Sequence, residues 1–186
     1  EDYAENWELV IVGKQARLRR VQELERQGRH DDARALAAAV EGDYPDVYWL
    51  VEGRAQRAAA RWGDAEKAFR KAVELNPNSV DAPFDLGELL LKSGKYQEAA
   101  DCFARVVERE PGYGLAYHQL GLCRQELGDR PAAMEAFQRA VAYAPFRADS
   151  HRDLAELLLQ EGRTGKALDE LHKALELQPD DEKAKE

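Results

Sequence analysis

The residues best suited to metal or nucleophilic chemistry in this sequence are four histidines and two cysteines. The histidines are His30, His118, His151 and His172. None belongs to an HExxH sequence or to a pair four residues apart, the spacings that place two imidazoles on one helix face to bind zinc. Cys102 and Cys123 fit neither a CxxC motif nor a disulfide framework, so we interpret them as free thiols with a packing role. The sequence therefore predicts no metal site and no cofactor.

Paired carboxylates are the next candidates, because they can support acid–base chemistry. Asp153 and Glu156 form one such pair, but pairs at this spacing are usual on the solvated face of a charged helix. The sequence also lacks the phosphate-binding motifs GxxxxGK[ST] and GxGxxG and the nucleophile motif GxSxG. We therefore predict that the protein is not an enzyme.

The composition favours helix and excludes two classes of partner. Alanine, leucine, glutamate, arginine and lysine dominate, whereas β-branched residues other than valine are scarce. A formal net charge of -9 gives no general attraction to nucleic acid or to anionic lipid. No apolar run approaches the roughly 18–20 residues that a membrane-spanning helix needs, so we expect no membrane insertion.

The cellular compartment has to be inferred from less specific features. The chain does not open with a basic and then apolar signal peptide, and its cysteines have no disulfide spacing, which together favour the cytoplasm. The chain also lacks an initiator methionine. A fragment or a processed product is therefore an open alternative, and the compartment of such a precursor stays unknown.

Several residue types recur along the chain at intervals close to 34 residues. One helical position holds Ala33, Ala65, Ala99, Ala133 and Ala167, which are 32, 34, 34 and 34 residues apart. Four residues further on, the chain has Ala37, Phe69, Phe103, Phe137 and Leu171. Each set is followed by a proline: Pro45, Pro77, Pro111, Pro145 or Pro179. A spacing of four keeps the alanine and the larger residue on one helix face, so each period predicts a helix A, a glycine turn and a helix B that ends before proline.

With these residues identified, the chain resembles the tetratricopeptide repeat (TPR) family. The likeness rests on the period, on the alanines, phenylalanines and prolines, and on the helix start Tyr117-His118-Gln119-Leu120-Gly121. The resemblance implies an all-α fold, a right-handed superhelical α-solenoid of stacked antiparallel helix pairs whose A helices line a concave groove. We divide the chain into five TPR units: 14–45, 46–79, 80–113, 114–147 and 148–181.

Three units depart from the family pattern, and the fourth unit does so at Arg124, where tyrosine or leucine is usual. The first unit has Arg20, Val21 and Ala37 where leucine, glycine and an aromatic residue are expected. We expect this unit to be distorted or to act partly as a cap. The second unit has Glu52 in place of leucine and Gln56 one turn later.

Both ends of the chain lie outside the five units. Residues 1–13 end in an apolar run, and we expect an N-terminal extension that either caps the array or docks to another chain. Periodicity leaves a strand and a helix equally open for so short a run. Residues 182–186 are expected to form a polar tail or the start of a further helix.

The face of each A helix beside the core is the expected binding surface. The second, fifth, ninth and twelfth residues of a unit share this face, and the family resemblance makes it the groove. In the first unit these positions include Gln22 and Glu25. The candidate peptide-binding residues of the groove are Arg54, Arg57, Asp81, Phe84, Asp85, Glu88, Leu91, His118, Gln119, Leu122, Arg152 and Glu156.

The order of charges along this face suggests how a peptide would lie. We expect an acidic part of the peptide near Arg54 and Arg57 and a basic part near Asp81, Asp85 and Glu88, with an apolar anchor between them. The alternative is that these are ordinary solvated side chains on the exposed side of the helices.

These features together predict a function and one alternative. Phe84 is the expected hot spot, because buried aromatic residues carry a disproportionate share of interface energy. The carboxylate clamp of chaperone-binding TPR proteins is disfavoured, since none of the ninth positions of the units is asparagine. We predict a non-enzymatic protein–protein interaction scaffold that binds a peptide or protein segment in the concave TPR groove. The alternative is an accessory or self-assembly module of a larger protein or complex, which uses residues 1–13, the C-terminal end or the convex face.

Overall fold

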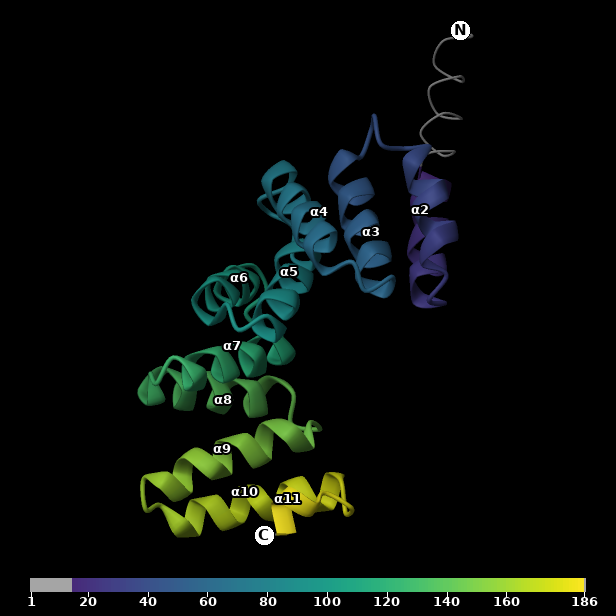
Figure 1. The fold of residues 1–186 in the computed structure, drawn as a ribbon. Helices are drawn as coiled ribbons and strands as arrows, with labels where there is room; N and C mark the ends of the chain where they lie inside the picture. The colour runs from purple at the N-terminus through teal and green to yellow at the C-terminus, as the bar shows by residue number, and fades with distance from the viewer. Residues whose placement is uncertain (1–14, 186) are drawn as a thin grey trace, which may run out of the picture. The chain divides into compact units, whose positions relative to one another are not determined.

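The secondary structure of the described part of the chain is helical throughout. A computed structural model describes residues 15–185 (Figure 1), and the all-α fold expected from the sequence is confirmed. Residues 15–26 form the first described helix. The helices that follow are α2 (His30–Ala38), α3 (Pro45–Ala58), α4 (Trp62–Leu75), α5 (Asp81–Lys92), α6 (Tyr96–Arg109), α7 (Gly114–Glu126), α8 (Arg130–Tyr143), α9 (Ala148–Gln160), α10 (Thr164–Leu177) and α11 (Glu182–Lys185). The expectation for residues 1–13 lies outside the described residues.

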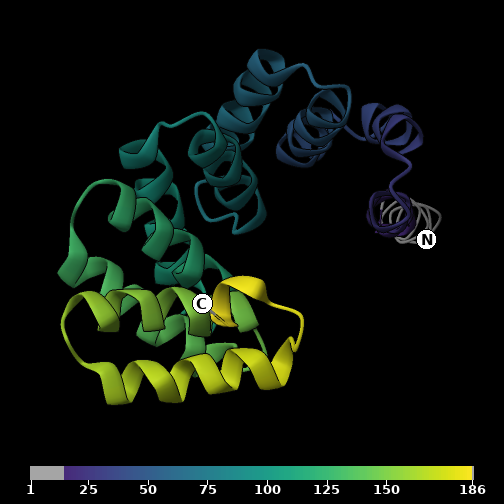
Figure 2. The ribbon, with the colours of Figure 1, turned by 60° about the horizontal axis from the view of Figure 1, so that its bottom comes forward.

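Consecutive helices form antiparallel pairs joined by short turns. Figure 2 shows this for α9 and α10, which lie side by side and run in opposite directions. Each of these helices also touches its other neighbour along the chain, α8 for α9 and α11 for α10. The most extensive packing of these helices is therefore with their neighbours in sequence, as in repeat proteins generally.

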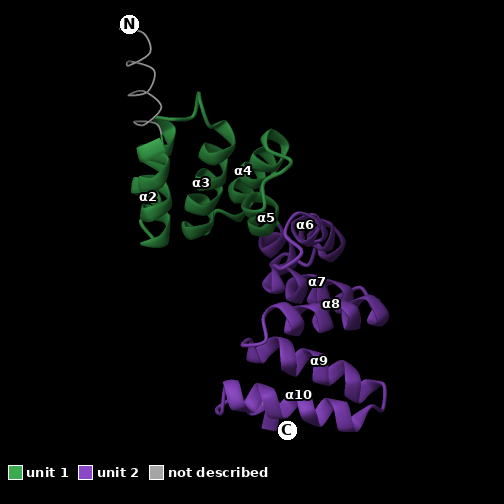
Figure 3. Ribbon diagram, turned by 180° about the vertical axis from the view of Figure 1, so that it is seen from behind, with its two compact units in different colours: residues 1–86 green, residues 87–186 purple. Residues whose placement is uncertain are grey.

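The chain divides into two compact units (Figure 3). Unit 1 ends at Leu86 and unit 2 begins at Gly87, so the boundary falls within α5. Residues 114–147 contain α7 and α8, and residues 148–181 contain α9 and α10. The division into five repeats remains our interpretation of the sequence.

Helices A and B of a pair pack closely where a glycine faces a phenylalanine ring. A Cβ atom added to Gly53 on α3 would lie 2.5 Å from the ring of Phe69 on α4. A Cβ atom added to Gly121 on α7 would lie 2.6 Å from the ring of Phe137 on α8. Both rings are completely buried, so they have no free space to move into. These glycines are therefore required by the neighbouring ring and not by their own backbone conformation.

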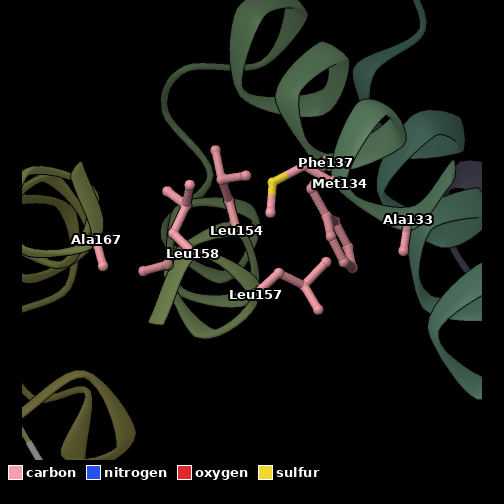
Figure 4. Close-up of a cluster of buried hydrophobic side chains, with 8 residues drawn as sticks. Ala133, Met134, Phe137, Leu154, Leu157, Leu158 and Ala167 are labelled. Atoms are coloured by element: carbon pink, nitrogen blue, oxygen red, sulfur yellow. The ribbon is translucent and has the colours of Figure 1, made fainter. Parts of the chain in front are cut away.

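Packing between successive pairs uses larger aliphatic residues. Figure 4 shows leucines of α9 facing Met134 and Phe137 of α8, with Ala167 of α10 on the other side of α9. The buried cluster consists of Ala133, Met134, Phe137, Leu154, Ala155, Leu157, Leu158 and Ala167. Together α8, α9 and α10 enclose one apolar core within unit 2.

The two polar residues at core positions of α3 form a hydrogen-bonded network. Glu52 and Gln56 are both buried, and Gln56 Nε2 donates to Glu52 Oε1 at 2.6 Å. Arg34 of α2 donates from Nε to Glu52 Oε2 at 2.5 Å, and Arg61 donates to Gln56 Oε1 at 3.4 Å. The polar substitutions are tolerated because each buried oxygen has a partner. Arg34 belongs to the first repeat (14–45) and Glu52 to the second (46–79), so this polar network joins the two repeats.

The turn after helix A needs a residue in the left-handed conformation. Glycine supplies it at Gly28, Gly94, Gly128 and Gly162, whose φ angles are 70°, 74°, 76° and 72°. After α3 the same place is taken by Ala60, with φ 57°. An L-residue with a Cβ atom is strained there by roughly 1–2 kcal/mol.

Ala60→Gly should therefore raise the free energy of unfolding. The strain energy that is relieved is larger than the extra conformational entropy that glycine loses on folding. The net gain in the free energy of unfolding should be about 0.5–1 kcal/mol. Urea unfolding followed by circular dichroism measures it. The matched control is Ala58→Gly, at the end of α3, which should lower stability by up to about 1 kcal/mol. A loss of stability in both variants would contradict the assigned strain.

Gly121→Ala should lower the free energy of unfolding by about 1–3 kcal/mol, because the new methyl group meets a buried ring. Phe137→Leu alone should also destabilise, since it leaves a void. In the double variant the methyl group enters that void, so the total loss should fall short of the sum by about 0.5 kcal/mol or more. Chemical unfolding of the three variants gives this coupling energy, and strictly additive losses would show that the two residues do not share space.

Candidate functional site

A hollow of about 530 Å³ lies in unit 1 between residues 21–30, α3 and the start of α5. Helix α3 contributes Val47, Leu50, Arg54 and Arg57 to its wall. These residues are three or four positions apart, so they project from one face of the helix. Together with Val51, they combine an apolar surface with two guanidinium groups. This mixture suits an apolar side chain of a ligand and the polar backbone beside it.

Arg54 is the electrostatic centre of the hollow. Its Nε donates to Asp85 Oδ2 at 2.6 Å, and its Nη1 donates to Glu25 Oε2 at 3.3 Å. A third carboxylate, that of Asp81, lies 4.0 Å from Nη2. Burial by itself lowers the pKa of Arg54, but the carboxylates, Asp85 first, outweigh burial and raise the pKa above its ordinary value. Arg54 is therefore a fixed cation that links three helices of unit 1.

Two further pairs complete the polar wall. Arg57 Nη1 lies 3.0 Å from Asp85 Oδ1, so the two arginines share one carboxylate. The Nδ1 atom of His30 lies 3.1 Å from Glu25 Oε1. Asp85 and Glu25 are nearly inaccessible, with side chains only 7% and 9% exposed. These carboxylates are therefore paired with the arginines and are largely shielded from solvent.

Some of the residues predicted from the sequence line this hollow and others do not. Arg54, Arg57, Asp81 and Asp85 are in its wall. Phe84 also lies in unit 1, where it is half-buried, but it is not part of that wall. The remaining predicted residues belong to unit 2: Glu88, Leu91, Gln119 and Leu122 are half-buried and Glu156 is exposed.

Two of the predicted polar residues of unit 2, His118 and Arg152, are engaged in pairs within the protein. His118 is buried, and its Nε2 atom lies 2.9 Å from Asp153 Oδ2. Arg152 donates to Asp181 Oδ2 at 2.8 Å and to Asp153 Oδ1 at 3.1 Å. The first pair joins α7 to α9, and Arg152 joins α9 to Asp181, just before α11, which is a structural use of residues expected to meet a ligand.

His30 is the part of the site that the sequence did not reveal. It comes from the first turn of α2, a B helix, whereas the groove was deduced from A helices alone. Its five-residue separation from Glu25 spans a turn, and no helical periodicity would bring the two together. The glycine turn at residue 28 was the available signal, because it reverses the chain between them.

Metal and nucleophilic chemistry find no support in the described part of the chain. Within residues 15–185, no group of three or more histidine, cysteine, aspartate or glutamate side chains is arranged to hold a metal ion. Both cysteines are buried, and burial raises the pKa of the Cys123 thiol to about 12, which keeps it protonated and unreactive. Among the same residues, no helix is both long and apolar enough to cross a membrane.

The sequence matches the family model of the tetratricopeptide repeat over residues 50–114 and 118–182. The chain belongs to the tetratricopeptide repeat family. Among curated TPR relatives, human superkiller complex protein 3 is 30% identical over 167 residues, which cover 89% of this chain and 9% of the human protein. In this and other curated relatives the match spans 27% or less of the relative's length.

Solved TPR structures share the fold. MamA from Desulfovibrio magneticus RS-1 superposes with a TM-score of 0.73 at 23% identity, over 91% of this chain and 97% of that one. YrrB, described as a TPR protein with an unusual peptide-binding site, has a TM-score of 0.73 at 24% identity, over 88% of this chain and 86% of its own. At these identities the likeness establishes the fold alone.

Arg54→Gln should destabilise the protein through the carboxylates that it leaves unpaired. Breaking a buried ion pair costs about 3–5 kcal/mol, and we expect the lower end because a quarter of the Arg54 side chain is exposed. The matched control is Lys67→Gln on α4, whose pair with Asp64 is an exposed surface pair within one helix and should change the free energy of unfolding far less. Thermal and urea unfolding of both variants test this, and equal losses would refute a central role for Arg54.

Proposed function

We propose that this TPR protein is a non-enzymatic interaction module that binds a peptide or protein segment through the groove face of its A helices, with the hollow of unit 1 as the anchoring point. The observation that carries the proposal is the hollow itself. Val47 and Leu50, both half-buried, stand beside a rigid polar wall. An open, preformed recess with an apolar floor and a few oriented polar groups is the usual form of a binding site.

The rigidity of the polar wall supports binding over simple solvation. Arg54, Arg57, Asp85 and Glu25 hold one another at distances of 2.6–3.3 Å. A ligand that enters the hollow therefore meets side chains that are already ordered, and little conformational entropy is lost on their account. The description of YrrB as having a peptide-binding site is consistent with this use of a TPR surface.

The other candidate residues are taken for each unit by itself. In unit 1, Phe84 adjoins Asp85 in α5. Unit 2 has candidates of its own: Glu88, Leu91, Gln119, Leu122 and Glu156, together with the paired residues His118 and Arg152. We propose these as secondary contacts. Leu122 also packs against the buried cluster of unit 2, so its substitution would affect stability as well as binding.

A second proposal is that the chain is an assembly module of a larger protein or complex. The small share of each curated relative that the chain matches supports it, 9% in the human superkiller complex protein 3. In that case the helical ends, in place of the hollow, would make the contacts. The two proposals differ in oligomeric state, which sedimentation of the intact chain measures.

Leu50→Arg should abolish peptide binding in the hollow. The test selects ligands from a phage-displayed library of random linear peptides on the immobilised intact protein, and then measures the affinity of selected peptides by fluorescence anisotropy. We expect Leu50→Arg to weaken them at least about tenfold, because a buried contact of more than 1.4 kcal/mol is replaced by a charge. Leu75→Arg, an exposed leucine of α4 outside the hollow, is the matched control and should leave affinity unchanged. Peptides that bind both variants like wild type would overturn the proposal.

A further inference from the structure

We infer that the hollow of unit 1 selects a segment in which a lysine or arginine stands next to an apolar residue, with the basic group paired to Asp81. This inference rests on the proposed function and specifies its ligand. It differs from the charge order expected from the sequence, in which Arg54 and Arg57 would attract an acidic part of the peptide.

The surroundings of Arg54 argue against an acidic ligand at this point. Its guanidinium already faces Asp85, Glu25 and Asp81. A ligand carboxylate would have to displace one of them and would be repelled by the other two. Like charges brought together in a partly desolvated site reject the wrong ligand.

Asp81 is the carboxylate of this cluster that a ligand can reach. Its side chain is 73% exposed, and its 4.0 Å distance from Arg54 Nη2 exceeds that of a hydrogen bond. By contrast, Asp85 is nearly inaccessible and is shared between Arg54 and Arg57. Three carboxylates therefore surround two guanidinium groups, and the negative charge in excess is available at Asp81.

The position of Asp81 relative to the apolar wall determines which residue stands next to the basic group of the ligand. Asp81 opens α5, and Val47 and Leu50 come from α3, the helix that Arg54 joins to Asp81 and Asp85. A ligand residue on this apolar surface would thus have a neighbour within reach of Asp81. The part of the wall formed by residues 21–30 carries Arg26, whose side chain is 78% exposed and 3.9 Å from Glu23. This arrangement gives the bound segment a direction, with its basic group toward α5 and away from Arg26.

The experiment uses the peptide selection described above, with the sequences of selected peptides as a second readout. We expect enrichment of lysine or arginine next to an apolar residue. Asp81→Lys should weaken these peptides about tenfold or more at low ionic strength, and added salt should weaken the binding to wild type. The matched control is Asp64→Lys, since Asp64 is also an exposed acid in the first turn of a helix of unit 1 but does not line the hollow. It should leave affinity unchanged within about twofold.

The outcomes separate this inference from the proposed function. Peptides that are lost on Leu50→Arg but show no basic enrichment, or that bind Asp81→Lys like wild type, would overturn the inference and leave the hollow as a binding site. Enrichment of acidic residues would overturn it as well. Peptides indifferent to Leu50→Arg would overturn both.

Discussion

The close contact of a glycine with a phenylalanine ring determines how the three central helix pairs are built. At Gly53, Gly87 and Gly121 an added Cβ atom would lie within 2.9 Å of the facing ring. The ring fills the space between helices A and B. The A helix of the next pair then packs against the ring through aliphatic residues, as Leu154 and Leu157 of α9 do against Phe137. Because this contact lies on the core side of helix A, the adjoining face of that helix is left for other uses. The hollow of unit 1 is on such a face of α3.

The first and last helix pairs show that the residue at the glycine position of helix A and the residue at the phenylalanine position of helix B share one volume. The last pair has Ala155 facing helix B, with Leu171 in place of phenylalanine, and the first pair has Val21 with Ala37. As the residue on helix A grows from glycine to alanine to valine, the residue on helix B shrinks from phenylalanine to leucine to alanine. Ala155, Val21 and Ala37 are all buried, so the exchange preserves a filled interior. A departure from the family pattern at one position is thus compensated at the other.

The sequence was sufficient to predict the helices and the core but not the state of the polar residues. Periodic alanines and phenylalanines predicted the buried faces, because burial depends on residue type and helical spacing. The same reasoning placed Arg54 and Asp85 on the groove face, yet they are 31 residues apart, and periodicity carries no information on whether such side chains meet each other or a ligand. That outcome depends on side-chain length and rotamer across two helices. The same limit applies to His118 and Asp153, which are 35 residues apart in the sequence but form a pair in the structure.

These pairs place stacking and recognition in competition for the same charges. Arg54 with Asp85 and His118 with Asp153 each link residues of consecutive repeats, and Arg152 of α9 pairs with Asp181, which lies just before α11. A buried ion pair adds little net stability, but it penalises any other register of the two helices, because a shifted pair would leave charges unpaired. A charge used in this way is largely withdrawn from a ligand. In the proposed mode of binding, recognition falls to residues at the rim of the pairs, and in unit 1 the rim residue with the most exposed carboxylate in the network is Asp81. Sequence differences between TPR proteins at such rim positions can therefore alter ligand choice without disturbing the stack.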